Sequence, residues 1–188
     1  GVRRVGECGA RLLIDDRSAP TCGHIRRVAD RWHRKNAAAT LRVLVVDYLQ
    51  LVATDNPRHS TYDRVSAASL GLLAIAKDLG IPVVALAQLS RKCEDRGDKR
   101  PMLSDLRESG QIEQDAHLVV SVYRDEVYNQ DSADRGVAEL AVLKNRTGAL
   151  GVARVASQFE YSRFADLASD DGRRVGAQRF PTRRAGGR

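Results

Sequence analysis

Two short apolar runs limit the fold of this chain more strongly than any other feature. Residues 41–50 read LRVLVVDYLQ, and residues 83–90 read VVALAQLS. Each run is rich in apolar and β-branched residues, is too short to form a helix of its own and ends in polar side chains. This pattern is typical of buried parallel strands, which deliver polar groups to the carboxyl edge of a sheet. The two runs therefore predict an α/β fold with Asp47 and Gln88 at that edge.

The residue types at this edge suit nucleotide chemistry. Ligands of open α/β sheets bind at the carboxyl ends of the strands. An aspartate there can hold Mg²⁺ or its water against the phosphates of a nucleotide, and a glutamine can sense the terminal phosphate. A structural interpretation also fits, in which Asp47 caps its strand and Gln88 is a polar group satisfied within the fold. The two runs alone leave both interpretations open.

The first half of the chain alternates between strand and helix patterns, whereas the second half reads mainly as strands joined by turns. The alternation indicates a parallel sheet with right-handed crossovers, and the later strands are expected to be partly antiparallel. Strands are predicted at residues 12–14 and 41–46, from Pro82, and at 137–143, 152–156 and 159–164. Helices are predicted at residues 21–35, where Thr21 is the cap, and at 61–79, where Gly80 ends the helix.

A long polar segment, residues 89–116, separates the two halves. Its basic and acidic side chains nearly balance, and a loop of this length is usually functional or disordered. Taken by itself, the segment favours a loop closed by internal ion pairs. A segment that binds a nucleic-acid backbone would need cations at chosen points rather than a general surplus.

Lys144 and Arg146 follow the strand predicted at residues 137–143. In an extended chain, residues i and i+2 point to the same face, so both cations could reach one phosphate group. Paired cations after a strand are otherwise usually a solvated edge. The spacing is compatible with either role.

No Gly-Lys dipeptide occurs anywhere in the 188 residues. A phosphate-binding loop needs a glycine-rich turn that ends in Gly-Lys-Ser or Gly-Lys-Thr, so this chain lacks the main phosphate cradle of a nucleotide-hydrolysing enzyme. We expect either a fragment of a longer protein or the product of a truncated or decayed gene.

The net charge of +7 is concentrated near the carboxyl terminus. From Asp171 onward six arginines face one aspartate, a balance of 6 − 1 = +5, which leaves +2 for the other residues. We expect this tail to be disordered and solvated. No run of 18 apolar residues could span a bilayer, and three widely spaced cysteines suggest reduced thiols in a cytoplasmic protein without a membrane partner.

Several strings, in this order and spacing, resemble the motor domain of replicative DNA helicases of the DnaB family. The most specific is DKRPMLSDLRESGQIEQDA at residues 98–116, and VVDYLQ, VVSVYRDEVY and KNRTG occur at residues 45–50, 119–128 and 144–148. The resemblance runs from about residue 12 to residue 167. It implies a RecA-like three-layer α/β fold with a mainly parallel sheet, antiparallel strands toward the carboxyl terminus, and a phosphate-binding loop upstream of this sequence.

The resemblance also implies roles for individual residues. Asp47 would help to hold Mg²⁺, Gln88 would sense the terminal phosphate of ATP, and Lys144 and Arg146 would reach the nucleotide of a neighbouring subunit, with Arg146 as an arginine finger. The matching positions for single-stranded DNA are Arg107, Glu108 and Gly110: a cation for phosphate, a carboxylate that orients it and a glycine that allows close approach.

At the level of the whole protein, the resemblance implies a hexameric ring that moves five-prime to three-prime on one DNA strand in a bacterial or phage replisome, with primase and a helicase loader as partners. We assign residues 12–167 to the ATPase domain, leave residues 1–11 unassigned and assign residues 168–188 to the basic tail. Two alternatives remain: a recombination ATPase of the RadA or RecA type, and a non-catalytic remnant that binds DNA or associates with a ring.

Overall fold

The computed structural model describes residues 2–5, 12–35, 41–56 and 58–167, but not the side chains of residues 2–5, 35 and 107–109. The chain forms two compact units. The first unit consists of Gly1–Gln88 and Leu106–Asp115, and the second of Leu89–Asp105 and Ala116–Arg188. Most of the predicted unassigned segment, residues 1–11, and all of the tail, residues 168–188, lie outside the described residues.

The parallel part of the fold lies in the first unit. Strand β3 (Leu44–Val46) pairs in parallel with β4 (Val83–Ala85), as the two apolar runs predict, although both strands are shorter than the runs. Strand β2 (Leu12–Asp15) instead pairs antiparallel with β1 (Val2–Val5). The predicted strand at residues 12–14 is therefore present, but a local partner takes it out of the parallel sheet.

Both predicted helices of the first unit are present. Helix α1 (Cys22–Lys35) begins after Thr21, whose hydroxyl accepts a hydrogen bond from the His24 N–H at 3.2 Å. Helix α2 (Thr61–Leu79) has the predicted bounds and ends at Gly80 in the left-handed conformation (φ 62°). At its start, Ser60 and Asp63 form a capping box, in which each side chain binds the backbone N–H of the other. Of the helices in the described ranges, none is long and apolar enough to cross a membrane.

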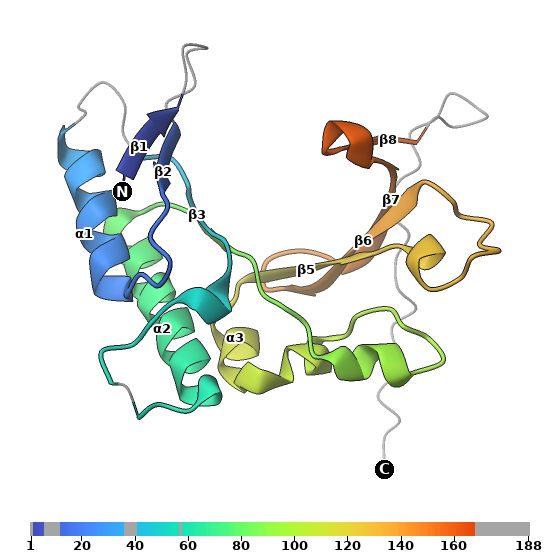
Figure 1. Cartoon of the computed structure of the whole chain (residues 1–188), viewed down its shortest axis with the longest axis horizontal. Helices are drawn as coiled ribbons and strands as arrows, with labels where there is room; N and C mark the ends of the chain where they lie inside the picture. The colour runs from blue at the N-terminus through green and yellow to red at the C-terminus, as the bar shows by residue number, and fades with distance from the viewer. Residues whose placement is uncertain (1, 6–11, 36–40, 57, 168–188) are drawn as a thin grey trace. The chain divides into compact units, whose positions relative to one another are not determined.

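The core of the first unit forms where α2 covers the parallel strands. Its buried side chains come from β3, the turn after it and one face of α2: Val46, Leu49, Val52, Val65, Ala68, Leu72 and Ile75. Helices α1 and α2 lie side by side (Figure 1), and they approach closely at Gly71. A Cβ atom on Gly71 would lie 2.5 Å from Sγ and 2.9 Å from Cβ of Cys22, so a side chain at position 71 would push the helices apart.

The second unit contains an antiparallel sheet of four strands in chain order (Figure 1): β5 (Leu118–Tyr123), β6 (Val137–Asn145), β7 (Gly151–Gln158) and β8 (Arg163–Asp166). The expected antiparallel arrangement is confirmed. The single strand predicted at residues 159–164 is wrong, because residues 159–161 form a 3-10 turn and Ser162 is left-handed (φ 50°). Strand β8 begins only after this break.

The segment predicted as a long loop, residues 89–116, contains regular structure. It holds two 3-10 segments, Arg91–Asp95 and Leu103–Ser109, and the short helix α3 (Gly110–Asp115). Ser90 caps the first of them, because its hydroxyl accepts the Lys92 N–H at 3.4 Å. Helix α3 packs on α2 in the first unit, where the Ser69 hydroxyl donates to the Asp115 carboxylate at 2.7 Å.

Candidate functional site

Asp47 and Gln88 lie beyond the carboxyl ends of neighbouring parallel strands. Val46 pairs with Ala85, and the ladder continues past both strands: the Leu86 N–H donates to the Val46 carbonyl at 3.0 Å, and the Leu49 N–H donates to the Leu86 carbonyl at 2.8 Å. Asp47 directly follows β3, and Gln88 lies three residues after β4. The structure thus brings both predicted residues to one edge of the first unit.

Gln50, to which the sequence analysis gave no role, holds the backbone of Gln88. Its side-chain amide nitrogen donates to the Gln88 carbonyl, and its amide oxygen accepts the Gln88 N–H, both at 3.2 Å. Gln88 is exposed, and its own side-chain amide makes no hydrogen bond to any residue that the structure describes. A glutamine whose backbone is fixed and whose side chain is open to solvent can reach a ligand without giving up a partner. The signal in the sequence was the polar end of the run VVDYLQ.

The carboxylate of Asp47 is exposed and, within the described part of the chain, makes no hydrogen bond or ion pair. Asp47 lines a cavity of about 790 Å³ between β2, α1 and β3. Among the described residues, no group of three or more His, Cys, Asp or Glu side chains could hold a metal ion. A single open carboxylate fits Mg²⁺, which keeps several waters and takes most remaining ligands from the phosphates of its substrate.

Lys144 and Arg146 lie at the end of β6 in the second unit. Lys144 pairs with Val119 of β5, and the Arg146 N–H donates to the His117 carbonyl at 3.0 Å, so the ladder continues past the strand. Lys144 thus lies in β6, which ends at Asn145, and Arg146 is the first residue of the bend that follows. A β-bulge precedes them, because the pairing shifts between Val119 and Val120. Bulges of this kind change the direction of the side chains that follow and are common beside functional sites.

Two arginines of the polar segment form paired contacts with carboxylates inside the second unit. Arg96 donates from both terminal nitrogens to the two oxygens of buried Asp105, each at 2.8 Å. Arg100 donates to the two oxygens of Glu139 on β6, at 2.7 and 2.8 Å. Arg96 therefore forms an ion pair within the segment, whereas the partner of Arg100 lies on β6.

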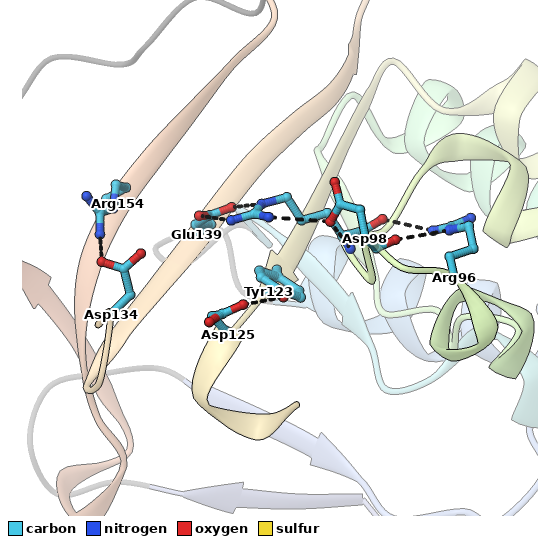
Figure 2. Close-up of polar contacts among 8 residues, drawn as sticks. Arg96, Asp98, Tyr123, Asp125, Asp134, Glu139 and Arg154 are labelled. Atoms are coloured by element: carbon cyan, nitrogen blue, oxygen red, sulfur yellow. Dashed lines mark hydrogen bonds and ion pairs between the residues drawn. The ribbon is translucent and has the colours of Figure 1, made fainter. Parts of the chain in front are cut away.

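The Arg100–Glu139 pair joins the segment to β6 (Figure 2), and the charged partners of the segment also shift pKa values. The guanidinium of Arg96 holds the pKa of Asp105 below its usual value, although burial opposes the shift. The guanidinium carbon of Arg100 lies 4.8 Å from the ring centre of Tyr123, whose hydroxyl donates to Asp125 at 2.7 Å. Burial, assisted by Asp125, raises the pKa of Tyr123 to about 12.

The residues predicted to contact DNA belong to the first unit, in its second segment, Leu106–Asp115. Arg107 and Glu108 belong to the 3-10 segment Leu103–Ser109, but their side chains lie outside the described part of the structure. Gly110 begins α3 and is exposed, and a Cβ atom on it would meet nothing within 4 Å. The fold itself therefore does not require glycine at position 110.

Comparison with known proteins identifies the family. The DnaB-like helicase C-terminal domain matches residues 4–166. The replicative DNA helicase DnaB of Haemophilus influenzae is 48% identical over 157 residues, which cover 84% of this chain and 33% of that protein. The same helicase from Pasteurella multocida is 47% identical over the same shares. The chain thus spans about a third of the length of these relatives.

Solved structures agree with this match. An ATPase domain aligns with a TM-score of 0.81 and 37% identity, over 85% of this chain and 56% of that one. A DnaB-like replicative helicase, studied for its interactions with primase, aligns with a TM-score of 0.79 and 38% identity over 82% of this chain and 37% of that one. These alignments confirm a partial RecA-like fold. This chain belongs to the family of DnaB-like helicase C-terminal domains.

Proposed function

We infer that this chain forms part of the ATP-dependent motor of a replicative helicase, which unwinds duplex DNA while it moves on one strand. The observation that carries the proposal is the shared strand edge of the first unit. Asp47 and Gln88 follow the two paired parallel strands there, and neither side chain has a partner among the described residues. Family membership makes a nucleotide the ligand expected at this edge.

Asp47 would hold Mg²⁺ through water, and Gln88 would respond to the terminal phosphate of ATP. The bound metal would neutralise charge on the phosphates during transfer. Lys144 and Arg146 would serve the nucleotide of the next subunit in a hexameric ring. Their two-residue spacing on a continued ladder suits joint contact with one phosphate group.

Arg107, Glu108 and Gly110 would contact the backbone of single-stranded DNA. Their place supports this role, because the neighbouring cations Arg96 and Arg100 are already paired with carboxylates of the chain. A DNA phosphate that contacts this segment would therefore bind residues other than Arg96 and Arg100. By analogy with the primase-interacting relative, primase is a candidate partner, together with a helicase loader in a cytoplasmic replisome.

Alone, the 188 residues would not hydrolyse ATP, because they contain no Gly-Lys dipeptide and hence no phosphate-binding loop. The proposal is therefore tested in a chimera. Residues 4–166 replace the matching third of the Haemophilus influenzae helicase, and DNA-stimulated ATPase and strand displacement are measured.

We expect the chimera to be active and Asp47→Asn to lower ATPase by roughly 10- to 100-fold, the range for an outer-shell metal partner. Asp55→Asn, which changes another exposed aspartate of the same unit, is the matched control and should have little effect. An Asp47→Asn chimera with full ATPase would refute the assignment of this edge. Strand exchange without strand displacement would instead favour a recombination ATPase.

A further inference from the structure

Both the side chain and the backbone of Asp105 form several hydrogen bonds within the second unit. Its carboxylate accepts both contacts from Arg96, and one of its oxygens also accepts the Met102 N–H at 2.7 Å. Its carbonyl accepts the Ser90 N–H at 3.0 Å, and its own N–H donates to the Met102 carbonyl at 2.9 Å. The residue is only 5% exposed.

The guanidinium of Arg96 is also fixed by several hydrogen bonds. Besides Asp105, its guanidinium donates to the carbonyls of Arg100 at 2.9 Å and Asp98 at 3.3 Å. A buried carboxylate with one cation depends strongly on that cation, because removal of either partner leaves a buried charge uncompensated. We call Arg96, Asp105 and Ser90 the Asp105 clamp.

The chain changes course immediately after the clamp. The helical path is interrupted at Leu106 (φ −78°, ψ 17°), and the chain then enters the first unit. There, α3 is held on α2: Asp115 accepts from Ser69 at 2.7 Å and from Gln111 at 2.8 Å. Ile112 packs against the core of the first unit. Residues 107–110 thus lie between two anchored points.

The clamp is also close to Gln88 along the chain. Gln88 is the last residue of the first unit before the chain enters the second, and Ser90 follows two residues later. The Ser90 N–H binds the Asp105 carbonyl directly. Ser90 is therefore two residues from Gln88 along the chain and one hydrogen bond from Asp105.

We propose that Asp105 is a positioning residue, which fixes the start of residues 107–110 to the backbone after Gln88 and so sets where Arg107 meets the DNA phosphate. The inference rests on the proposed DNA contact of Arg107. Asp105 itself need not touch DNA, because its carboxylate is buried and bound by Arg96 and Met102.

The test is a double-mutant cycle in the 188-residue chain, with Asp105→Asn, Arg107→Ala and both changes together. Binding to a labelled poly-deoxythymidine oligonucleotide is measured by fluorescence anisotropy, and backbone amide exchange is followed by mass spectrometry. Glu139→Gln is the matched control, because it breaks an ion pair of similar geometry with Arg100 in the same unit. If Asp105→Asn unfolds the chain, Arg96→Lys takes its place, since lysine keeps the charge but loses the paired contact.

We expect Asp105→Asn to speed amide exchange at Ser90 and residues 106–110 and to weaken binding roughly fivefold, about the net value of one hydrogen bond. In the Arg107→Ala background it should weaken binding no further, and Glu139→Gln should change neither measurement. Unchanged exchange, an additive loss of binding, or an equal effect of Glu139→Gln would overturn the positioning role. If Arg107→Ala leaves binding intact while Asp105→Asn speeds exchange, the proposed DNA contact itself fails, and the positioning role falls with it.

Discussion

Helices α1 and α2 approach closely at Gly71. The sign of the change in unfolding free energy on Gly71→Ala shows whether helix propensity or overpacking dominates there. Gly71 lies inside α2, where replacement by alanine gains about 1 kcal/mol of helix propensity. The new Cβ atom would, however, lie 2.5 Å from Sγ and 2.9 Å from Cβ of Cys22. The sulfur could rotate away, but the Cβ of Cys22 can move only with α1. Overpacking of this kind costs roughly 1–3 kcal/mol, so we expect Gly71→Ala to lower the free energy of unfolding by roughly 1 kcal/mol.

Urea unfolding of the 188-residue chain, followed by circular dichroism at α-helical wavelengths, measures this change. Gly23→Ala is the control in α1, because its Cβ atom would meet only ordinary contacts, at 3.7 and 3.8 Å from Arg27 and Thr21. In a Cys22→Gly background the obstacle is gone, and Gly71→Ala should then increase stability. If Gly71→Ala stabilises the chain with Cys22 present, the packing argument is incorrect.

Three further predictions concern the site and the buried Asp105. The purified 188-residue chain should show no magnesium-dependent ATP hydrolysis; turnover that Asp47→Ala abolishes would contradict this. In the chimera, Arg107→Ala should reduce the slope of log affinity for single-stranded DNA against log salt by roughly 0.7, the value for one phosphate contact, whereas an unchanged slope would make Arg107 structural. Because Arg96 lowers the folded-state pKa of Asp105 below the usual 3.8, the stabilisation from Asp105 is complete above the unfolded-state pKa and is lost as pH falls through the folded-state pKa. The stability difference between the unmodified chain and Asp105→Asn should therefore hold from neutral pH to about pH 5 and shrink below about pH 4, which urea titrations at each pH can measure.

Local signals explain which parts of the fold the sequence could predict. Helix α2 has the expected bounds because its capping residues and Gly80 lie next to the ends that they fix. Asp47 and Gln88 lie at one edge because each follows an apolar strand, and the carboxyl ends of paired parallel strands lie at the same edge of the sheet. The bounds of α2 follow from residues next to its ends, and the position of Asp47 and Gln88 follows from the apolar pattern of the two strands.

Contacts between distant residues explain what the sequence could not predict. The polar segment is ordered by pairs such as Arg100 with Glu139, which are 39 residues apart, and no local pattern encodes such a partner. Strand β2 is not part of the parallel sheet and pairs antiparallel with β1. The β-bulge before Lys144 depends on the register with β5, which the sequence of β6 alone does not contain.

A motor built from several subunits requires that Arg146 act on the nucleotide of a neighbouring subunit, and mixed rings test this proposed role most directly. One chimera carries Arg146→Ala, and a second carries a disabled lysine in the phosphate-binding loop of the helicase part. Each should be inactive alone, because removal of an arginine finger costs roughly 10³-fold or more. Mixed rings contain interfaces that pair an intact loop with an intact Arg146, so ATPase should partly return. If ring formation is verified independently and no activity returns, Arg146 does not act across the subunit interface.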